Sequence, residues 1–267
     1  KLIAQNNSYR IIVLDNLSTG TPKDLSEVTN YRILEKSSHP PISEGVYLLQ
    51  ADIRDIKSLV KFSEGIDCIV HLAANTGVGP SIEDPRLDME FNVIGTFNSL
   101  EAARINNVKN FVFASSGAPA GEVNPPIHEE LPPHPVSPYG SSKLAGEGYC
   151  SSYYHSFGIN TICLRFGNVF GPRSKHKSSV IAKFIKKALS KEICEIYGDG
   201  TQTRDFIYID DLVNAILLAI EAPLGGEIFQ IATSFERTVN EAALEIQKQL
   251  LKNDLKMRIK YGERKIG

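Results

Sequence analysis

Short apolar runs alternate with longer amphipathic stretches along the first part of the chain. The runs are rich in Ile, Val, Leu and Phe, which indicates buried strands. They cover residues 10–15, 46–50, 68–74, 110–115 and 161–166. Helix-length segments separate them, notably Leu87 to Asn106 and Pro138 to Phe157. This alternation predicts an α/β fold with a doubly wound, mostly parallel sheet, because crossover helices join parallel strands.

The pattern changes after residue 167. Helices are predicted over residues 180–190, 208–221 and 239–251, and short strands over residues 193–197, 228–231 and 257–261. The sequence therefore predicts a main domain over residues 1–167 and a smaller, mixed α/β C-terminal substrate lobe over residues 168–267, with elements that can interleave. The Pro-rich stretch 119–138 is predicted to be a long loop.

Composition narrows the class of protein. The chain has 267 residues, of which 42% are hydrophobic and 22% charged, as is usual for globular proteins. A formal net charge of −2 gives no general attraction to nucleic acid or anionic membranes. The four cysteines have neither CxxC pairing nor zinc-site spacing, which favours reduced thiols. We therefore expect a cytoplasmic protein without a metal site and without a nucleic-acid or membrane partner.

Polar residues follow several of the predicted strands, where ligands of open α/β sheets bind. Asp15 ends one such strand, and an acid there accepts the ribose hydroxyls of a dinucleotide and repels a 2′-phosphate, which favours NAD over NADP. The alternative is a plain turn acid. Asp52 and Ile53 could flank an adenine ring, or Asp52 could cap a helix. We interpret His71 as a packed histidine.

The Gly-rich turn that usually holds the pyrophosphate should lie about 20 residues before Asp15. That position falls before Lys1, so Lys1 to Asn7 are predicted to end the first helix. The first strand of the sheet is then missing from the given chain and is expected upstream of it.

A Tyr and a Lys with helical spacing lie beside a strand that ends in serine. The strand ends at Ser116, and the Ser-Pro pair at 137–138 supplies a good helix start before Tyr139 and Lys143. Residues four apart share a helix face, so Lys143 is expected to lower the pKa of the Tyr139 phenol, while Ser116 binds the same substrate oxygen. The same spacing at 261–265 ends a predicted strand and lacks this context.

A third cluster follows the strand at 161–166. It contains Asn168 and, further along, Arg204, whose guanidinium suits a diphosphate. The alternative for Arg204 is an ion pair with Asp205 or Asp210. Asp210 and its neighbour are expected at a helix start rather than in a metal site.

These motifs together resemble the extended short-chain dehydrogenase/reductase family, and within it the UDP-glucose 4-epimerase-like, NAD-dependent epimerase/dehydratase group with a Rossmann-type sheet. The motifs are Asp15-Asn-Leu, Ala51-Asp-Ile, His71-Leu-Ala-Ala, Asn92-Val-Ile-Gly-Thr, Ser115-Ser116, Tyr139 to Lys143, Leu164-Arg165 with Asn168-Val169 and Gly171-Pro172, and Gly198 to Phe206.

The resemblance implies roles for individual residues. For catalysis it implies Ser116, Tyr139 and Lys143. Around NAD it implies Asp15, Asn16, Leu17, Ser18, Thr19, Gly20, Asp52, Ile53, Leu72, Ala73, Ala74, Thr76, Asn92, Tyr139, Lys143 and Gly167. Around a nucleotide-sugar substrate, typically a UDP-hexose, it implies Ser116, Asn168, Val180, Glu195, Tyr197 and Arg204. By analogy, the two long helices are expected to pair in a homodimer.

The chain also departs from the pattern of similar proteins. Gly117 and Ala118 stand where dehydratases carry two acids, Pro119-Ala120 alters the local loop, and Gly167 replaces a usual aromatic residue. Lys265 stands about where similar proteins carry a second diphosphate-binding Arg. We therefore expect a C4 epimerase. The alternatives are a 4,6-dehydratase or decarboxylase, with Glu122 as a substitute acid, and a non-catalytic sugar-nucleotide or NAD binder.

Overall fold

The computed structural model describes residues 8–174, 177 and 179–263, so Lys1 to Asn7 and Lys265 lie outside the described residues. Contacts divide the chain into two compact units. Unit 1 comprises Lys1–Arg165 and Val213–Gln230, and unit 2 comprises Phe166–Leu212 and Ile231–Gly267.

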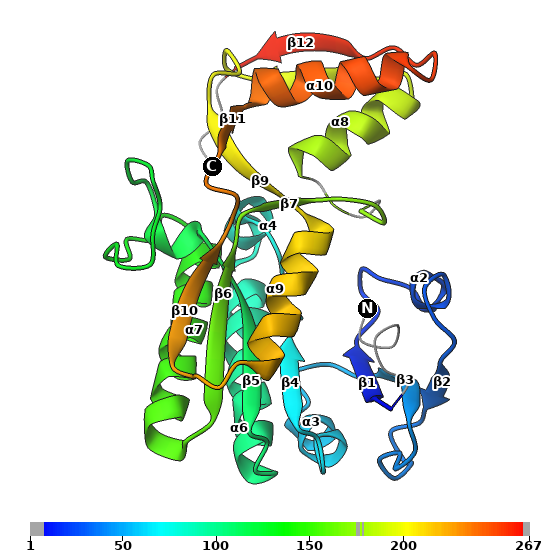
Figure 1. Ribbon diagram of the computed structural model, residues 1–267, viewed down its shortest axis with the longest axis vertical. Coiled ribbons are helices and arrows are strands. Elements are labelled where there is room, and N and C mark those ends of the chain that lie inside the picture. Colours follow the sequence, from blue (N-terminus) through cyan, green and yellow to red (C-terminus); the bar gives the residue numbers. More distant parts are fainter. Residues whose placement is uncertain (1–7, 175–176, 178, 264–267) are drawn as a thin grey trace. The chain divides into compact units, whose positions relative to one another are not determined.

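The centre of unit 1 is a four-stranded sheet with the order β10-β6-β5-β4 (Figure 1). The strands are β4 (Cys68–His71), β5 (Asn110–Ser116), β6 (Asn160–Phe166) and β10 (Glu227–Ile231). β4 and β5 run parallel, with Val70 opposite Val112. Their burial is continuous: Phe111, Phe113 and Leu164 are almost fully buried, as expected for strands covered on both faces. The predicted α/β class with parallel strands is confirmed.

A second, three-stranded sheet of unit 1 has the order β1-β3-β2, and both of its pairings are parallel. Its strands are β1 (Arg10–Asp15), β2 (Arg32–Leu34) and β3 (Gly45–Gln50). In the described part of the chain, no strand joins this sheet to the four-stranded one. The two sheets each carry part of the candidate site at the carboxyl ends of their strands.

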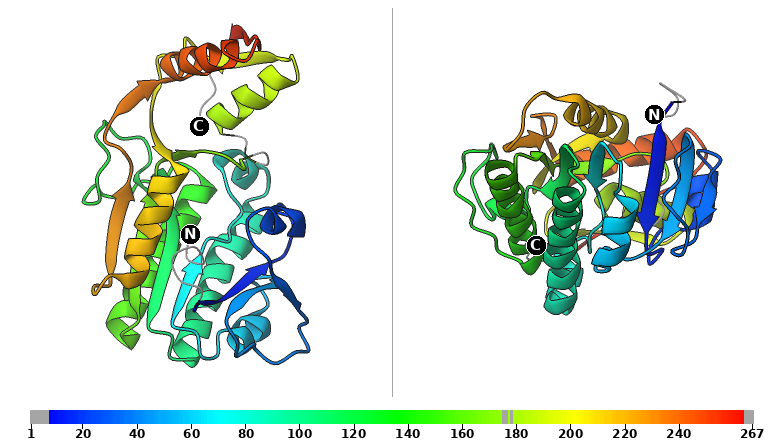
Figure 2. Two further views of the ribbon diagram at one scale, coloured as in Figure 1. Left: turned by 45° about the vertical axis from the view of Figure 1, so that its right-hand side comes forward. Right: turned by 90° about the horizontal axis from the view of Figure 1, so that it is seen from below.

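Helices cover both faces of the four-stranded sheet. α6 and α7 pack side by side on one face, and α9 lies on the other (Figure 2). The helices of this unit are α2 (Pro22–Ser26), α3 (Ile56–Phe62), α4 (Val78–Glu83), α5 (Pro85–Met89), the π-helix η1 (Glu90–Ile94), α6 (Gly95–Ile105), the 3-10 turn η2 (Ala118–Ala120), α7 (Pro138–Phe157) and most of α9 (Ile209–Glu221).

Unit 2 is a small mixed α/β structure. One sheet has the order β11-β9-β7 and the other pairs β12 with β8 in parallel. The elements are β7 (Asn168–Phe170), α8 (Val180–Leu189), β8 (Ile193–Tyr197), β9 (Thr203–Tyr208), β11 (Glu236–Thr238), α10 (Val239–Leu251) and β12 (Arg258–Gly262). Phe184, Cys194, Ile196 and Met257 are buried together and form its core.

The structure shows how the C-terminal elements are divided between the units. Val213–Gln230, part of the stretch predicted as a second lobe with elements that can interleave, belong to unit 1, where β10 is the edge strand beside β6. The predicted helix from Leu87 to Asn106 consists of α5, η1 and α6, because a π-helical turn interrupts it. A local pattern reveals neither the sheet that an edge strand joins nor a single wide turn.

The Pro-rich stretch 119–138 is a loop apart from η2, as predicted. Its middle is fixed to the sheet at one point: the backbone N–H of Gln230 in β10 donates to Glu129 Oε1 over 2.6 Å.

Helix α7 lies unusually close to strand β5. Gly146 of α7 faces the ring of Phe113, and a Cβ atom built on Gly146 would lie 2.4 Å from its Cζ atom. The Phe113 ring is fully buried and stacks against His71, with ring centroids 6.0 Å apart, so it has no free space to move into. The glycine therefore permits the close approach that brings the start of α7 to the end of β5.

This packing gives a prediction with an internal control. Gly146→Ala is expected to lower the free energy of unfolding by about 1–3 kcal/mol, because the added methyl overpacks a filled site. Gly148→Ala in the same helix meets nothing within 4 Å and is expected to raise it by about 0.5–1 kcal/mol, because alanine favours helix. Urea unfolding of both variants measures the effects. Equal shifts of the same sign would contradict the close-packing account.

Candidate active site

Tyr139 stands in the first turn of α7, where the sequence predicted it. Ser137 caps this helix, because its hydroxyl accepts the backbone N–H of Gly140 over 3.1 Å, and Pro138 is the first helical residue. Tyr139 is half-buried, and its phenol is hydrogen-bonded to Ser116 at the end of β5. The cap therefore fixes the phenol beside the strand-end hydroxyl.

The charge environment of Tyr139 differs from the expectation. Burial raises the pKa of the phenol, the hydrogen bond to Ser116 opposes that rise, and the negative charge of Asp88 adds to it. The prediction that Lys143 lowers this pKa is wrong for this structure, because desolvation is the largest effect. The phenol here is a neutral hydrogen-bonding group.

Lys143 follows one turn later and is only 3% exposed. Its ammonium donates to the backbone carbonyl of Ala114 in β5 over 2.8 Å. It lies 4.9 Å from the ring centroid of Phe113 and 5.9 Å from that of Tyr139. The geometry brings the ammonium and the phenol to one side of the strand end, as the spacing predicted.

The two serines that end β5 have different surroundings. Ser115 is buried, and its hydroxyl donates to Glu147 Oε1 over 2.6 Å. Glu147 is also bound by Arg165 in a bidentate pair, with both N···O distances at 2.8 Å. Ser116 instead faces Tyr139 and accepts the backbone N–H of Ala118 over 3.2 Å. The structure thus leaves Ser116, the predicted catalytic serine, as the one beside the phenol.

Asn92, predicted near NAD, is a buried residue of the π-helix. Its Oδ1 accepts the backbone N–H of Asn75 over 2.8 Å, and its Nδ2 donates to the carbonyl of Asn75 over 2.9 Å. The same Nδ2 lies 2.9 Å from Asp88 Oδ1 and 3.1 Å from Ser142 Oγ. Asn92 therefore holds the segment that follows β4, which includes the predicted residues Leu72, Ala73, Ala74 and Thr76.

The turn after β1 is built around its two polar residues. Asp15 is exposed, and its Oδ1 accepts the backbone N–H of Leu17 over 2.7 Å, while Asn16 Oδ1 accepts that of Ser18 over 3.0 Å. Leu17 has a positive φ of 59°. The carboxylate of Asp15 is an acceptor only, which suits two ribose hydroxyls as donors. Thr19 and Gly20 follow in the same turn, and a Cβ on Gly20 would meet nothing within 4 Å.

Asp52 is tied to its neighbours at the end of β3. Its carboxylate accepts Arg54 Nε over 3.0 Å and Asn16 Nδ2 over 3.2 Å, and the Arg54 hydrogen bond lowers its pKa to about 2. The alternative that Asp52 caps a helix is wrong, because Asp55 caps α3. Ile53 is buried and packs on Gly95 of α6, where an added Cβ would lie 2.3 Å from its Cδ1 atom.

Exposure differs along the segment after β4. Leu72 is 54% exposed although it follows a buried strand, so it offers apolar surface at the sheet edge. His71, in contrast, is buried and stacks on Phe111 and Phe113, as predicted for a packed histidine. Burial lowers its pKa to about 3, helped by the charge of Lys143, so the imidazole is neutral at pH 7.

The predicted substrate residues all lie in unit 2, apart from Ser116. Asn168 is exposed on β7, and Val180 begins α8 and packs on the core of this unit. Glu195 and Tyr197 are neighbours on β8: Glu195 forms an ion pair with Lys260 over 3.1 Å, and Tyr197 accepts Lys183 Nζ over 3.1 Å. Gly167 has little free space around it, since a Cβ there would be 3.3 Å from the carbonyl oxygen of Ile231.

Arg204 is exposed on β9 and donates to the carbonyl of Thr203 over 2.7 Å. The carboxylate of Asp205, one of the alternative partners of Arg204, is bonded to another residue: its Oδ1 accepts the backbone N–H and the hydroxyl of Thr233 over 2.9 and 2.6 Å. The antiparallel pairing places Arg237 of β11 directly opposite Arg204. Directly opposite residues share a sheet face, and two cations there favour an anion between them. The sequence did not indicate Arg237, because its partner is set by the fold.

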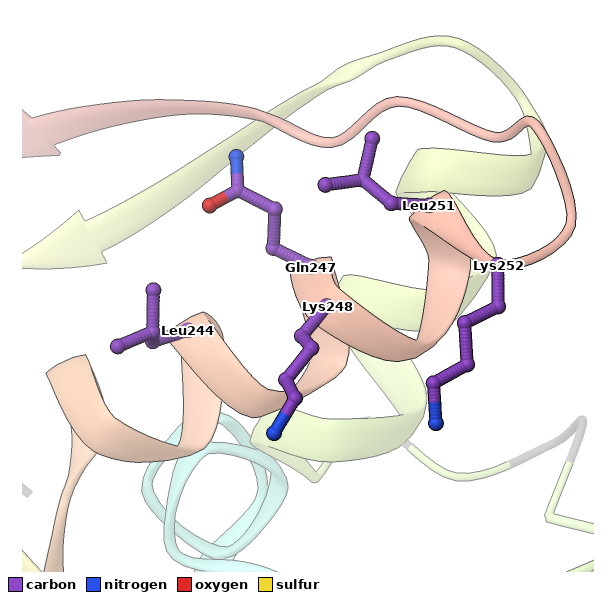
Figure 3. A pocket seen from close by; sticks show the side chains of 5 residues that line it. All are labelled: Leu244, Gln247, Lys248, Leu251 and Lys252. Carbon is purple, nitrogen blue, oxygen red and sulfur yellow. The ribbon is translucent and has the colours of Figure 1, made fainter.

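Other features of the described residues carry no part of this site. A surface pocket lies along one helix, α10, and contains none of the predicted residues (Figure 3). Its lining residues are Leu244, Gln247, Lys248, Leu251 and Lys252. Over the described ranges, no three or more His, Cys, Asp and Glu residues are arranged to hold a metal ion. None of the helices described is both long and apolar enough to span a membrane.

Comparisons with known proteins agree with this geometry. A sequence model of the NAD dependent epimerase/dehydratase family matches residues 1–232. The chain is 38% identical over 241 residues to the putative UDP-glucose 4-epimerase of Methanocaldococcus jannaschii, covering 88% of this chain and 72% of that protein. It is 32% identical over 250 residues to human dTDP-D-glucose 4,6-dehydratase, covering 92% of this chain and 67% of that protein.

A solved structure gives the same result. The UDP-glucose 4-epimerase of Thermus thermophilus, crystallised with NAD, matches with a TM-score of 0.83 at 32% identity, covering 100% of this chain and 82% of that one. The resemblance drawn from the sequence motifs is thereby confirmed. The chain belongs to the NAD dependent epimerase/dehydratase family, and its cofactor is NAD.

Proposed function

We propose that this protein is an epimerase that inverts C4 of a nucleotide-activated hexose, of the UDP-glucose or UDP-galactose type, through a 4-keto intermediate. The observation that carries the proposal is the segment after Ser116. Gly117 and Ala118 follow it, and Ala118 N–H donates to the serine hydroxyl, so this segment offers no carboxylic acid beside Tyr139. Besides NAD as the hydride acceptor, oxidation at C4 needs only the hydroxyl, the phenol and the ammonium found here.

The chain's own residues then have separable tasks. Ser116 hydrogen-bonds the C4 oxygen, and ionised Tyr139 takes the C4 hydroxyl proton as the C–H bond breaks. Bound NAD would supply the acceptor for the C4 hydride and, once reduced, the hydride donor for the return step. The keto sugar turns over, C4 is reduced on its opposite face, and Tyr139 gives the proton back. Lys143 holds positive charge near the phenol throughout. No net redox change results, so free NADH does not accumulate.

Substrate and cofactor contacts follow the predicted residues. Asp15 suits the adenosine ribose, and Leu72 offers apolar surface near the strand ends. Arg204 suits the substrate diphosphate, and Arg237 beside it adds a second cation. Asn168, Val180, Glu195 and Tyr197 are proposed around the sugar nucleotide.

We also propose that the protein forms a homodimer and works in a reducing compartment. A homodimer through α6 and α7 is supported by exposed apolar side chains on these helices, among them Ile105, Tyr149 and Phe157. Four free cysteines support a reducing compartment such as the cytoplasm.

A 4,6-dehydratase is the second candidate, because a dehydratase relative and an epimerase relative are both 32% identical to the chain. That reaction needs a further acid and base to expel a leaving group. Glu122 could supply one of them, but it is exposed in the Pro-rich loop. The local residues therefore favour epimerisation over dehydration and over the related decarboxylation.

Proton NMR of the protein incubated with NAD and UDP-hexoses tests the assignment. We expect the C4 configuration of UDP-glucose or UDP-galactose to invert, without a signal from a 6-deoxy sugar. A 4-keto-6-deoxy product would establish the dehydratase instead. Absence of any product with every UDP- and dTDP-hexose, in the presence of bound NAD, would favour a non-catalytic binder.

A further inference from the structure

Asp88 is a buried carboxylate that the proposed mechanism does not use. It lies on the short helix α5 and is 1% exposed. Ionisable side chains are rarely this buried unless a partner compensates for the lost water. No sequence motif indicates this residue, because it lies between the recognisable motifs.

The contacts of Asp88 lead to the start of α7. Its Oδ1 accepts Nδ2 of Asn92 over 2.9 Å, and the same amide lies 3.1 Å from the hydroxyl of Ser142. The Ser142 hydroxyl in turn donates to the carbonyl oxygen of Tyr139 over 3.0 Å. The carboxylate is thus two hydrogen bonds away from the helical turn that carries Tyr139 and Lys143.

The charges around Asp88 also relate it to Tyr139 and Lys143. Burial raises the pKa of its carboxyl, while the Ser142 hydrogen bond and the charge of Lys143 oppose that rise. The negative charge of Asp88 in turn raises the pKa of Tyr139. The charge of Lys143 also lowers the pKa of His71 on β4, and the His71 imidazole is neutral at pH 7.

The remaining acidic groups nearby on these elements have other surroundings. Glu83 of α4 is exposed, and Glu90 of η1 is bound by Arg54 and Arg86 over 3.3 and 3.1 Å. Asp88 is therefore the acidic group of α4, α5 and η1 that acts on Tyr139 and Lys143.

We propose that Asp88 is a positioning residue of the active site: through Asn92 and Ser142 its buried carboxylate holds the first turn of α7, which carries Tyr139 and Lys143, and it places a negative charge beside that turn. Such a carboxylate sets the pH at which the phenol becomes a base. The assignment of Tyr139 as that base rests on the proposed function, whereas the electrostatic link does not.

Asp88→Asn tests the link, because asparagine keeps a carbonyl acceptor and removes the charge. With the negative charge gone, phenolate is less opposed, so the pKa of Tyr139 falls. We expect the ring ¹³Cζ resonance of Tyr139, assigned by its loss in Tyr139→Phe, to titrate at lower pH in Asp88→Asn than in the wild type. The acidic limb of kcat/KM is expected to move to lower pH as well, whereas a purely structural role would leave the limb in place.

Asp84→Asn is the matched control. Asp84 caps α5 four residues earlier, its side chain is exposed, and asparagine caps a helix equally well. The same loss of charge there is expected to leave the Tyr139 titration unchanged. Equal titration of Tyr139 in Asp88→Asn and wild type, or a shift to higher pH, overturns the proposal.

A measurement on the wild type keeps the proposal testable if Asp88→Asn does not fold. The ¹³Cγ resonance of Asp88 is expected to be that of an ionised carboxylate at neutral pH. A protonated Asp88 under those conditions overturns the proposal, because a neutral carboxyl places no negative charge beside the turn. Neither titration needs a substrate, so failure of the epimerase assignment shows only in the product analysis, and failure of the Asp88 proposal shows only here.

Discussion

Tyr139→Phe is expected to lower kcat by about 10²–10⁴-fold, because the variant loses the group that takes and returns the C4 hydroxyl proton. The ring itself stays, so the packing of the first turn of α7 and the cap by Ser137 are retained. KM and NAD binding are therefore expected to change little. Single-turnover measurement of C4 inversion, with NAD content and thermal unfolding measured on the same sample, separates loss of chemistry from loss of structure.

Tyr149→Phe supplies the comparison. Tyr149 lies on the same helix and is 38% exposed, so removal of its hydroxyl touches no part of the proposed site. It is expected to retain the kcat of the wild type. If Tyr139→Phe and wild type turn over every substrate equally, or if neither shows turnover, the proton-transfer role of Tyr139 is refuted and the non-catalytic binder becomes the better assignment.

The elements that the sequence predicted well are those with strong local signals. The apolar run at Asn110–Ser116 and the capped helix Pro138–Phe157 lie where they were expected, because burial on both faces and a Ser-Pro start leave a clear pattern. β9 and β7 escaped notice. Their short sequences have no clear apolar pattern, and they gain strand structure from pairing: β9 pairs with β11 and with β7, where Asn168 lies opposite Phe206.

The candidate site divides in the same way. Tyr139, Lys143 and Ser116 were identified because a helix start and a strand end are both local features. Asp88 was not, since only the fold shows that its side chain is buried beside Ser142 and Asn92. The predicted direction of the Tyr139 pKa shift was wrong for the same reason. Spacing indicates a nearby cation, which would lower the pKa, whereas the desolvation that raises it depends on the whole surroundings of the ring.

Glu147 is a buried acid that joins several elements of unit 1. Its ion pair with Arg165 joins α7 to β6, both side chains are almost fully buried, and Ser115 of β5 donates to the same carboxylate. The hydrogen bond to Glu147 also raises the pKa of Arg165. The three elements α7, β5 and β6 therefore meet at one carboxylate.

Glu147→Gln is expected to lower the free energy of unfolding by about 3–5 kcal/mol, because it leaves the Arg165 guanidinium charged, buried and without a counter-ion. Urea unfolding measures the loss. Adding Arg165→Met to Glu147→Met removes both charges together and is expected to recover most of the stability, since a buried pair contributes little beyond a well-packed apolar replacement. Glu245→Gln, which removes an exposed ion pair with Lys248 on α10, is expected to have no measurable effect. A Glu147→Gln protein as stable as the wild type would show that the guanidinium finds another partner, and that the pair does not hold α7 against the sheet.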